Sequence, residues 1–439
     1  MSLGSALIGL DAFSPDRQLE RLQQEIPAEL IEEALQVTGK ASVKKRKLPA
    51  ELAIWLVIGM ALFRDFAIAE VVKQLGLALP DKGGKNSVAR SVTSDCRGRL
   101  GAEPVKWLFR KCAEIWSRQT QPYSMYRGLK LVGMDGVLFR VADSTENRAH
   151  FGAHHNGQAA SGYPLCRMVG LFILGSHVII DAVFGPHTTS EHVLSKSLWE
   201  QVLEKSIVIV DRLFRCSNLL IPLERMGGDR FWLTRAPEKR NWQVVEVLGP
   251  GDFIVEVKIY PQQRALNPSL PPTWRFRVVE YQRKGFRPSA LCTSLLDPKQ
   301  FPANELADLY HHRWEIELAY DELKTEMLER QETLRSKTPE RVAQEIWGLL
   351  LAFNLVRVEM TRVAAKANVS PNRISFVGAL RLMQLLWLVS AHSAPGRLPD
   401  RLAQMEDDIQ SLVLPERRER SYPRQVKAQA RKYSQASPC

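Results

Sequence analysis

Apolar residues recur with helical spacing over roughly the first 120 residues of the chain. The segment AELIEEALQVTG is amphipathic and ends in a glycine, and an almost continuous apolar run follows Pro49. A further segment runs from Ser87, a suitable N-cap, to Gly101, a helix stop. The pattern therefore predicts helices at 28–39, 50–63, 67–77 and 87–101.

Strand-like runs separated by helices replace that pattern from residue 128. The run at 128–143 is β-rich and is interrupted by Asp135-Gly136, and 165–185 predicts two strands that turn near Gly175-Ser176. Further strands are expected at 206–214, with Asp211 at the end of its buried part, and at 231–236; helices are expected at 190–204 and 217–226. This order predicts a mixed α/β unit.

Residues 237–300 alternate apolar and polar positions between turn signals, as in an antiparallel β insertion. Helical periodicity then returns. One helix is predicted over 310–327, another over 341–367 and others to about 413, before a basic tail at 417–433.

Composition points to a folded protein with an anionic partner. The 439 residues carry a formal net charge of +12 and a pI of about 9.4, which favours nucleic acid. The six cysteines form no CxxC pair, as is typical of a reducing compartment. No signal peptide is recognisable, and the apolar run at 52–63 is too short to span a bilayer, so we expect a cytoplasmic, nucleoid-associated protein without a membrane partner.

The predicted helix at 310–327 carries an unusual row of polar side chains. At about 100° per residue, Tyr310, Arg313, Glu317 and Lys324 fall within an arc of roughly 60°. They run beside an apolar stripe suited to a core. The neighbouring histidines at 311–312 are about 100° apart and cannot grip one ion from a single helix face. The alternative to a functional row is an ordinary solvated helix face.

Three carboxylates stand at distinctive points of this α/β pattern: Asp135 in the first strand, Asp211 at a strand end and Glu317 on the later helix. Carboxylates on central strands are costly to bury unless a cation compensates them. Oxygen donors suit Mg²⁺ or Mn²⁺, and two such ions would support phosphoryl transfer. Among rival acids, Asp143 fits a cap or turn, and Asp181 follows a strand from which it could face a metal.

Strand-borne Asp, strand-end Asp and helix-borne Glu resemble the ribonuclease-H-like arrangement of polynucleotidyl transferases. The spacing Tyr310-x2-Arg313-x3-Glu317-x6-Lys324 resembles the Tyr-Arg-Glu-Lys signature of the insertion-sequence-four group of DDE transposases. DGVLFRVADSTEN and IVDRLF resemble the segments that carry the first two acids of that family, and RKLPAELAIWLVIGMALFRD resembles its N-terminal domain. The resemblance runs over nearly the whole chain.

This resemblance implies cut-and-paste transposition, with binding of terminal inverted repeats, nicking, hairpin formation at the element ends and strand transfer. It implies that Asp135, Asp211 and Glu317 bind two Mg²⁺ or Mn²⁺ ions, and that a homodimer acts on paired ends of double-stranded DNA. Tyr310, Arg313 and Lys324 become contacts to the DNA backbone. An aromatic residue of the insertion can stack on a flipped base in such enzymes, but Trp242 and Trp274 are better explained as packed strand residues.

Several basic residues outside the signature are further candidates for DNA contact. A helix-turn-helix-like unit near the N-terminus is one interpretation of its short cationic helices, and a plain helical bundle with a basic surface is the other. Arg235 ends the strand before the insertion, where a surface salt bridge is the alternative to DNA. The N-terminal candidates are Lys44, Lys45, Arg46, Lys85, Arg90, Arg97 and Arg99.

The expected organisation is an all-α N-terminal DNA-binding domain, a ribonuclease-H-like α/β catalytic core interrupted by a β-rich insertion, and a helical C-terminal region. The boundaries are 1–120, 128–236 for the first part of the core, 237–300 for the insertion, 301–335 for the helix carrying Glu317, and 336–439. Two alternatives to an active transposase stay open: an inactive or domesticated descendant that binds DNA as a regulator, and a metal-dependent nuclease that cleaves without joining. The histidines at 150, 154 and 155 lie in a glycine-rich loop, and metal binding there is not expected.

Overall fold

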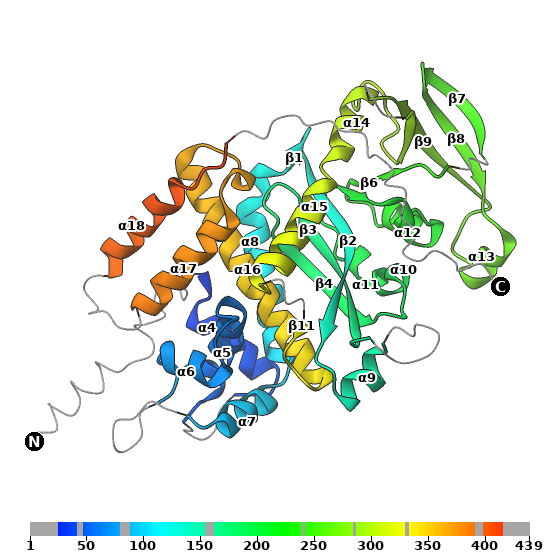
Figure 1. Ribbon diagram of the computed structural model, residues 1–439. Helices are drawn as coiled ribbons and strands as arrows, with labels where there is room; N and C mark the ends of the chain where they lie inside the picture. Colours follow the sequence, from blue (N-terminus) through cyan, green and yellow to red (C-terminus); the bar gives the residue numbers. More distant parts are fainter. Residues whose placement is uncertain are drawn as a thin grey trace, which may run out of the picture.

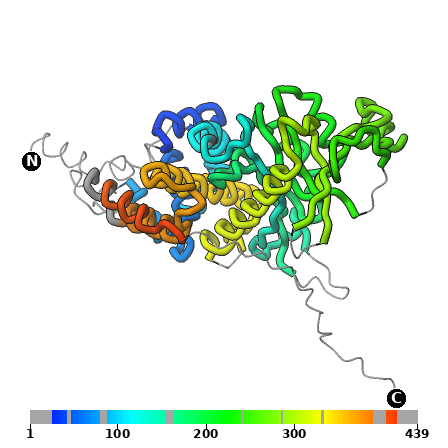
Figure 2. Tube along the Cα trace, turned by 90° about the horizontal axis from the view of Figure 1, so that it is seen from above, coloured from blue at the N-terminus to red at the C-terminus, as the bar shows by residue number. Residues whose placement is uncertain are grey.

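A computed structural model of the chain describes residues 25–41, 47–79, 88–153, 162–238, 242–283, 287–329, 333–390 and 398–415. The molecule is elongated, with helices gathered at one end and a long sheet extending to the other (Figures 1 and 2). In the described residues no helix is both long and apolar enough to cross a membrane.

A single mixed sheet organises the middle of the molecule. Its strand order is β4-β3-β2-β5-β6-β10-β9-β8-β7, with the short β1 and β11 pairing to β2. Strands β2, β5 and β6 run parallel, and β3 and β4 extend that group antiparallel. The first group comprises β2 (Leu129–Val141), β3 (Leu165–Ile173), β4 (Ile179–Pro186), β5 (Ser206–Val210) and β6 (Arg230–Arg235). These bounds confirm the strands predicted at 165–185 and 231–236 and the short strand predicted to end on Asp211, whereas Arg212–Phe214 form a 3₁₀ turn.

Strand β2 is continuous where the sequence predicted an interruption. Asp135 and Gly136 pair in register with Gly170 and Val169 of β3, within an unbroken run of pairs. A Cβ at Gly136 would lie 2.3 Å from Cδ of Glu191. The glycine therefore makes room for a packed carboxyl group and does not mark a turn.

The β insertion extends the same sheet. Its strands are β7 (Gln243–Gly249), β8 (Asp252–Lys258), β9 (Thr273–Tyr281) and β10 (Ser289–Thr293), with helix α13 (Pro261–Leu266) between β8 and β9. Each neighbouring pair is antiparallel, as predicted, and β10 returns to pair with β6. Where the insertion joins the core, the N–H of Ala236 donates to the carbonyl of Ala290 at 2.8 Å.

Helices cover both faces of the sheet, each over its own apolar core. One core includes side chains of α15 (Trp314–Asp321) and α16 (Pro339–Ala367), and the other includes those of α11 (Lys196–Trp199) and α12 (Ser217–Arg225). The single helix expected at 190–204 is wrong, because α10 (Glu191–Leu194) ends before α11 begins. Between them, the buried Ser195 hydroxyl bonds to the His192 carbonyl and to the Trp199 indole, both at 3.3 Å, and so competes with regular helix bonding.

The N-terminal and C-terminal helices pack against the long helix α16. The N-terminal helices α4 (Ala28–Val37), α5 (Ala50–Leu62), α6 (Ile68–Gln74) and α7 (Arg90–Leu100) confirm the predicted positions. Helix α8 (Glu103–Thr120) has no counterpart among the predicted helices, and the C-terminal α17 (Phe376–Ser390) and α18 (Leu398–Gln410) follow α16. Helix α5 is buried on every side from Leu52 onward, as its apolar run predicted. It crosses α16 so closely that a Cβ at Gly348 would lie 2.4 Å from Cγ1 of Val57.

A buried group of ions and hydrogen bonds ties the N-terminal helices to α16. The Glu345 carboxylate accepts bonds from Nη1 of Arg64 at 2.8 Å and from the backbone N–H groups of Arg335 and Ser336 at 3.0 and 2.9 Å. Arg97 of α7 donates to Gln344 and to the Ser336 hydroxyl at 2.8 and 2.9 Å. These contacts join α5, α7 and α16 to the segment that follows β11 (Thr333–Leu334).

Candidate active site

The sheet brings Asp135 and Asp211 to the same level on adjacent strands. Met134 of β2 pairs with Val210 of β5 in a parallel ladder, so each aspartate is the next residue along its strand direction. The Asp211 side chain accepts the N–H of Arg212 at 2.6 Å and caps a short 3₁₀ turn. The strands thus place two carboxylates side by side, and the charge of Asp211 acts on Asp135.

The Asp135 carboxyl lies in a poorly solvated place. Its pKa is raised to about 6, chiefly by burial; the N–H of Gly136 and the Arg313 guanidinium lower it, and the charges of Glu191 and Asp211 raise it. Oδ1 accepts the Gly136 N–H at 2.8 Å, and Oδ2 lies 3.6 Å from Nη1 of Arg313. One oxygen is therefore fixed by the backbone, and the other faces the helix across the site.

The signature segment is not the single helix that the sequence predicted. Helix α14 (Ala303–His311) ends before His312-Arg313, α15 follows, and residues Glu322–Met327 form a π-helix (Figure 1). Around the junction, the N–H groups of His312 and Arg313 bond to the carbonyls three residues earlier, at 3.1 Å each. Such tight bonds interrupt the regular α-helix, so a helical wheel drawn across the junction does not hold.

Arg313 lies between two of the three acids. Its Nη2 donates to Oε1 of Glu317 at 2.5 Å, while Nη1 faces Asp135. The Arg313 side chain is 19% exposed and that of Glu317 is 38% exposed, so the bridge is shielded from solvent on the arginine side only. The contact brings Glu317, which lies in the first turn of α15, into the group formed by Asp135 and Asp211.

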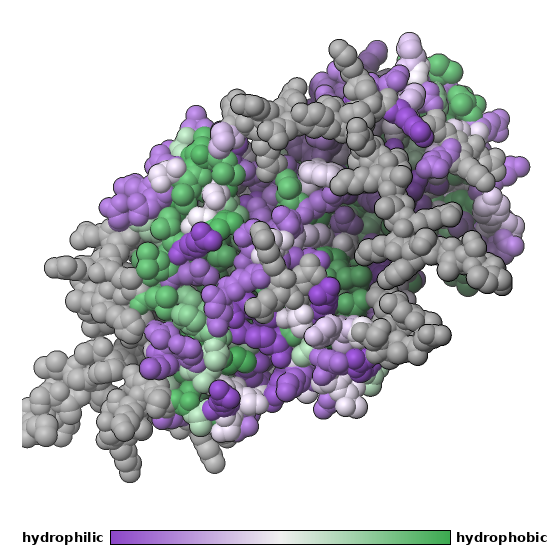
Figure 3. Space-filling view, in the orientation of Figure 1, coloured by the Kyte–Doolittle hydropathy of each residue, from purple (hydrophilic) through white to green (hydrophobic). Residues whose placement is uncertain are grey.

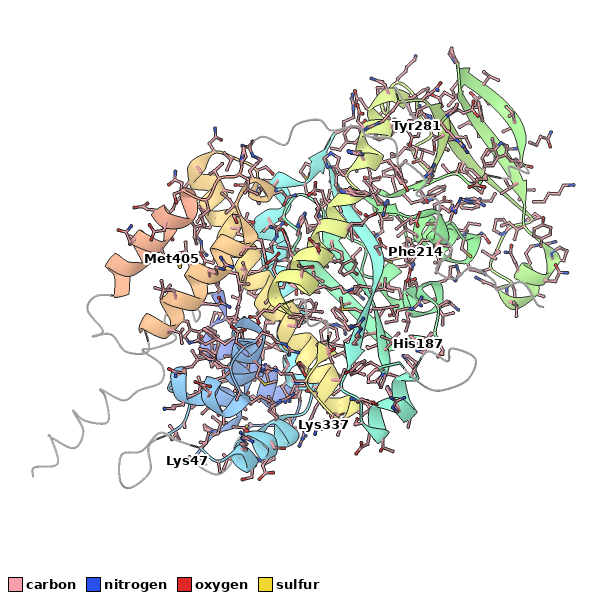
Figure 4. All side chains as sticks on the ribbon, in the orientation of Figure 1. Lys47, His187, Phe214, Tyr281, Lys337 and Met405 are labelled. Carbon is pink, nitrogen blue, oxygen red and sulfur yellow. The ribbon has the colours of Figure 1, made fainter. Side chains whose placement is uncertain are left out.

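Tyr310 and Arg235 border the same group. Burial raises the pKa of the Tyr310 phenol to about 12. The charge of Asp211 also raises this pKa, and the charge of Arg235 lowers it. Figure 4 shows Tyr281 where β9 ends beside α14. The Tyr281 phenol also raises the pKa of Tyr310. Arg235 is exposed at the end of β6, and its Nε donates to the Ser289 hydroxyl at 3.2 Å.

Lys324 falls in the π-helical segment and is partly buried. Because a π-helix bonds residue i to i+5, it holds more residues per turn than an α-helix. The angle of about 100° per residue that aligned Lys324 with Glu317 therefore does not apply there. Lys324 lies on the segment that carries Glu317, in its π-helical part.

A buried histidine that the sequence did not single out contacts the segment formed by α15 and the π-helix. His177, in the β3–β4 turn, is 2% exposed, and its two ring nitrogens lie 2.8 and 3.2 Å from carboxylate oxygens of Glu315 and Glu322. Both ring nitrogens thus face acids on α15 and the π-helix. His311 and His312, by contrast, are exposed.

Glu191 is a fourth acid near Asp135, and the sequence gave little sign of it. Its carboxyl packs against Gly136, and its Oε1 lies 3.2 Å from Nη1 of Arg167. Its charge raises the pKa of Asp135. The one usable signal was Ser190, whose hydroxyl caps α10 and so marks Glu191 as an acid in the first helical turn.

The rival acids are engaged elsewhere. Asp143 forms an exposed ion pair with Arg148, with Oδ2 2.7 Å from Nη2. Asp181 is buried and binds the Arg110 guanidinium through both oxygens, at 3.1 and 3.0 Å. Trp274 is a packed strand residue, as predicted: it is 6% exposed and its indole donates to Glu224 at 3.2 Å.

The structure separates the N-terminal cations into different environments. Arg90 and Arg99 are exposed on α7. The prediction that Arg97 contacts DNA disagrees with its burial, because the residue is 5% exposed and its guanidinium donates to Gln344 of α16. The remaining predictions for Lys44, Lys45, Arg46 and Lys85, and for the histidines at 154 and 155, lie outside the described residues. His150 is described and packs edge-on against Phe151.

The donor set of the site suits a hard divalent cation. Asp135, Asp211 and Glu317 offer only carboxylate oxygens, the ligands that such ions prefer. With the side chains as they lie, the described residues contain no group of three His, Cys, Asp or Glu ready to hold an ion. Arg313 supplies the positive charge between Asp135 and Glu317 in this arrangement. Over the middle of the face seen in Figure 3, where α15 crosses the sheet, the surface is mostly polar.

The sheet thus brings together an aspartate on one strand, an aspartate just past the end of the parallel neighbour and a glutamate on a nearby helix. A family model described as "Transposase DDE domain" matches residues 130–355, and one described as "Insertion element 4 transposase N-terminal" matches residues 16–110. The chain belongs to the insertion-element-4 family of DDE transposases, and is thus a polynucleotidyl transferase by family.

Two relatives from Escherichia coli (strain K12) fit this assignment. The chain is 36% identical over 438 residues to "Transposase InsG for insertion sequence element IS4", covering 99% of this chain and 98% of the relative. It is 33% identical over 234 residues to "Putative transposase InsZ", covering 53% of this chain and 77% of the relative. A solved piggyBac transposase synaptic complex with hairpin DNA is more distant, with 12% identity and a TM-score of 0.40 over 88% of this chain and 82% of that chain.

Proposed function

We propose that this protein is an active cut-and-paste transposase in which Asp135, Asp211 and Glu317 bind the divalent cations used for DNA cleavage and strand transfer. The observation that carries the proposal is the meeting of three elements. Two aspartates follow paired residues of adjacent parallel strands, and Arg313 links Asp135 to Glu317 from the signature segment. We assign this part of the sheet to a ribonuclease-H-like core.

Cation binding is proposed for these carboxylates in the form of two Mg²⁺ or Mn²⁺ ions. Bound there, the ions would neutralise the reacting phosphate and lower the pKa of an attacking water or 3′-hydroxyl. The protein's own contribution is to hold the carboxylates apart at fixed positions on two strands and one helix. With cations on the carboxylates, Arg313 would be available to bind a DNA phosphate.

DNA contacts are proposed for the cations and the phenol that border the acids. Arg313, Lys324 and Arg235 carry charges suited to phosphate, and Tyr310 stays protonated and can donate a hydrogen bond. Arg90 and Arg99 present exposed charge on α7. We propose that residues 1–120 bind the terminal repeats and that a homodimer forms hairpins on paired ends. In the proposed organisation, the core consists of 128–236 and 301–335 and is interrupted by the insertion at 237–300. A helical C-terminal region at 336–439 completes it.

The test is cleavage and joining of a duplex that carries the element's terminal repeat, with Mg²⁺. Wild type is compared with Asp135→Ala, Asp211→Ala and Glu317→Ala, and with Asp143→Ala as a matched acid outside the site. We expect each triad variant to lose at least about 100-fold in cleavage rate, because each removes a ligand of the proposed cations, whereas Asp143→Ala retains activity. Unchanged cleavage in a triad variant would remove that residue from the site, and cleavage without joined product would identify a nuclease.

A further inference from the structure

The Tyr320 hydroxyl forms hydrogen bonds to both β2 and β3 at the level of Asp135. It donates to the carbonyl of Asp135 at 2.6 Å and accepts the N–H of Gly170 at 3.0 Å. Asp135 and Gly170 are direct partners in the antiparallel pairing of β2 with β3. A side chain from α15 therefore takes part in the hydrogen bonding of the sheet at the position of a proposed cation ligand.

The surroundings leave the phenol little freedom. Tyr320 is 6% exposed, and its ring packs edge-on against Phe172 with centroids 5.1 Å apart. A Cβ at Gly170 would lie 3.0 Å from the Tyr320 oxygen and 2.8 Å from the Phe172 ring. The glycine thus makes the space that the hydroxyl uses.

The bridge reaches the Asp135 carboxylate through a single peptide unit. Tyr320 holds the C=O of the Asp135–Gly136 peptide, and the N–H of the same peptide donates to Oδ1 of Asp135 at 2.8 Å. Because a peptide is planar, fixing one end fixes the direction of the other. The hydroxyl thereby orients Oδ1 and leaves Oδ2 turned toward Arg313.

The same residue also sets the spacing between two acids. Tyr320 lies three residues after Glu317 on α15, so both stand on one side of that helix. Anchoring Tyr320 to the Asp135 peptide holds Glu317 at a set distance from Asp135. We propose that Tyr320 is a positioning residue for the reaction, which keeps Asp135 and Glu317 in the geometry that binds cations; this rests on the function proposed above.

The decisive variant is Tyr320→Phe, which keeps the ring against Phe172 and removes only the bridging oxygen. Tyr126→Phe is the matched control, because it loses a phenol hydrogen bond of 2.7 Å to Glu305 away from the acids. For Tyr320→Phe we expect the cleavage rate constant to fall about tenfold or more, with the Mg²⁺ concentration for half-maximal rate raised and DNA affinity unchanged. Tyr126→Phe should keep the wild-type values.

A measurement without catalysis separates positioning from general stability. Hydrogen–deuterium exchange of peptides covering 129–141 and 165–173 should quicken in Tyr320→Phe and not in Tyr126→Phe. Gly170→Ala serves as a second variant, because its methyl group would displace the hydroxyl while keeping it present, and it should raise the Mg²⁺ requirement in the same way.

Wild-type rate and Mg²⁺ dependence in Tyr320→Phe would overturn the inference. So would a lowered melting temperature with unchanged rate and Mg²⁺ dependence, because that result describes a purely structural residue. If Asp135→Ala itself cleaves normally, the proposed function fails and the inference fails with it. If Asp135→Ala is inactive and Tyr320→Phe is normal, only the inference fails.

Discussion

Replacing Glu345 with glutamine tests how the N-terminal helices are held to the rest of the molecule. The carboxylate is buried and lies between the Arg64 guanidinium and the N–H groups of Arg335 and Ser336. Glutamine is nearly isosteric, but its NH₂ group cannot accept the bonds made by Ser336. The substitution also leaves the buried charge of Arg64 without its partner.

The expected loss of stability follows from the buried ion pair that the substitution breaks. Removing one partner of a buried ion pair costs about 3–5 kcal/mol, because the other charge stays buried and unpaired. An unfolding entropy of about 2.1 cal/mol/K per residue gives about 0.9 kcal/mol/K for 439 residues unfolding together. The melting temperature of Glu345→Gln should therefore fall by about 3–5 °C.

The same carboxylate makes stability depend on pH. Neighbouring Arg64 and Arg97 and the bond from Ser336 hold the pKa of Glu345 below its usual value, against the opposing effect of burial. The stabilisation that comes from this lowered pKa is complete above the pKa of glutamate in the unfolded chain. It is lost as the pH falls through the lower folded-state pKa. Glu345→Gln removes this contribution, so its disadvantage relative to wild type should shrink in acid.

Differential scanning calorimetry of both proteins between about pH 3 and 7 measures these shifts, because the contribution changes below the usual glutamate pKa. Glu340→Gln is the control on the same helix: Glu340 is exposed, and glutamine keeps an acceptor for the Ala102 N–H that it receives at 3.1 Å. Its melting temperature should change by about 1 °C or less. A wild-type melting temperature in Glu345→Gln, or an equal loss in both variants, would refute the assigned role of the buried carboxylate.

Two further predictions concern the site. Arg313→Ala should weaken DNA binding and make the slope of log affinity against log salt less negative by about 1, as filter binding at several salt concentrations would show; Arg118→Ala, which removes an exposed charge on α8, should leave the slope unchanged. Gly136→Ala should slow cleavage and lower stability by about 1–3 kcal/mol, because its Cβ would collide with Glu191, whereas Gly249→Ala meets nothing within 4 Å and should behave as wild type in the same cleavage and melting assays.

Most helices and strands followed from patterns that act locally. The apolar run of α5 predicted a helix buried on all sides, and the short strand before Asp211 matched β5. Periodicity succeeds in such segments because burial and backbone bonding favour the same conformation. The junction at His312-Arg313 escaped prediction, because one turn of tight i→i+3 bonding spans too few residues to leave a period of its own in the sequence.

The prediction for Arg97 failed for a different reason. A cation on a short helix is usually solvated, and nothing in its own segment reports the partners that bury it. Those partners, Gln344 and Ser336, lie about 240 residues later in the chain. Glu191 and His177 were missed in the same way, because their importance comes from contacts across the sheet with Asp135 and with Glu315.

The bond between Ala236 and Ala290 has a consequence for how this protein can change over evolution. The chain leaves the core after β6 and returns beside it as β10, so the insertion joins the core through this one strand pair. Hairpins beyond that point can gain or lose residues at their tips at small entropic cost, since loop closure depends only weakly on length. Such length changes leave β2, β5 and α15 where they are. Among relatives, the β insertion is therefore where deletions and added segments should collect while the spacing of the three acids stays constant.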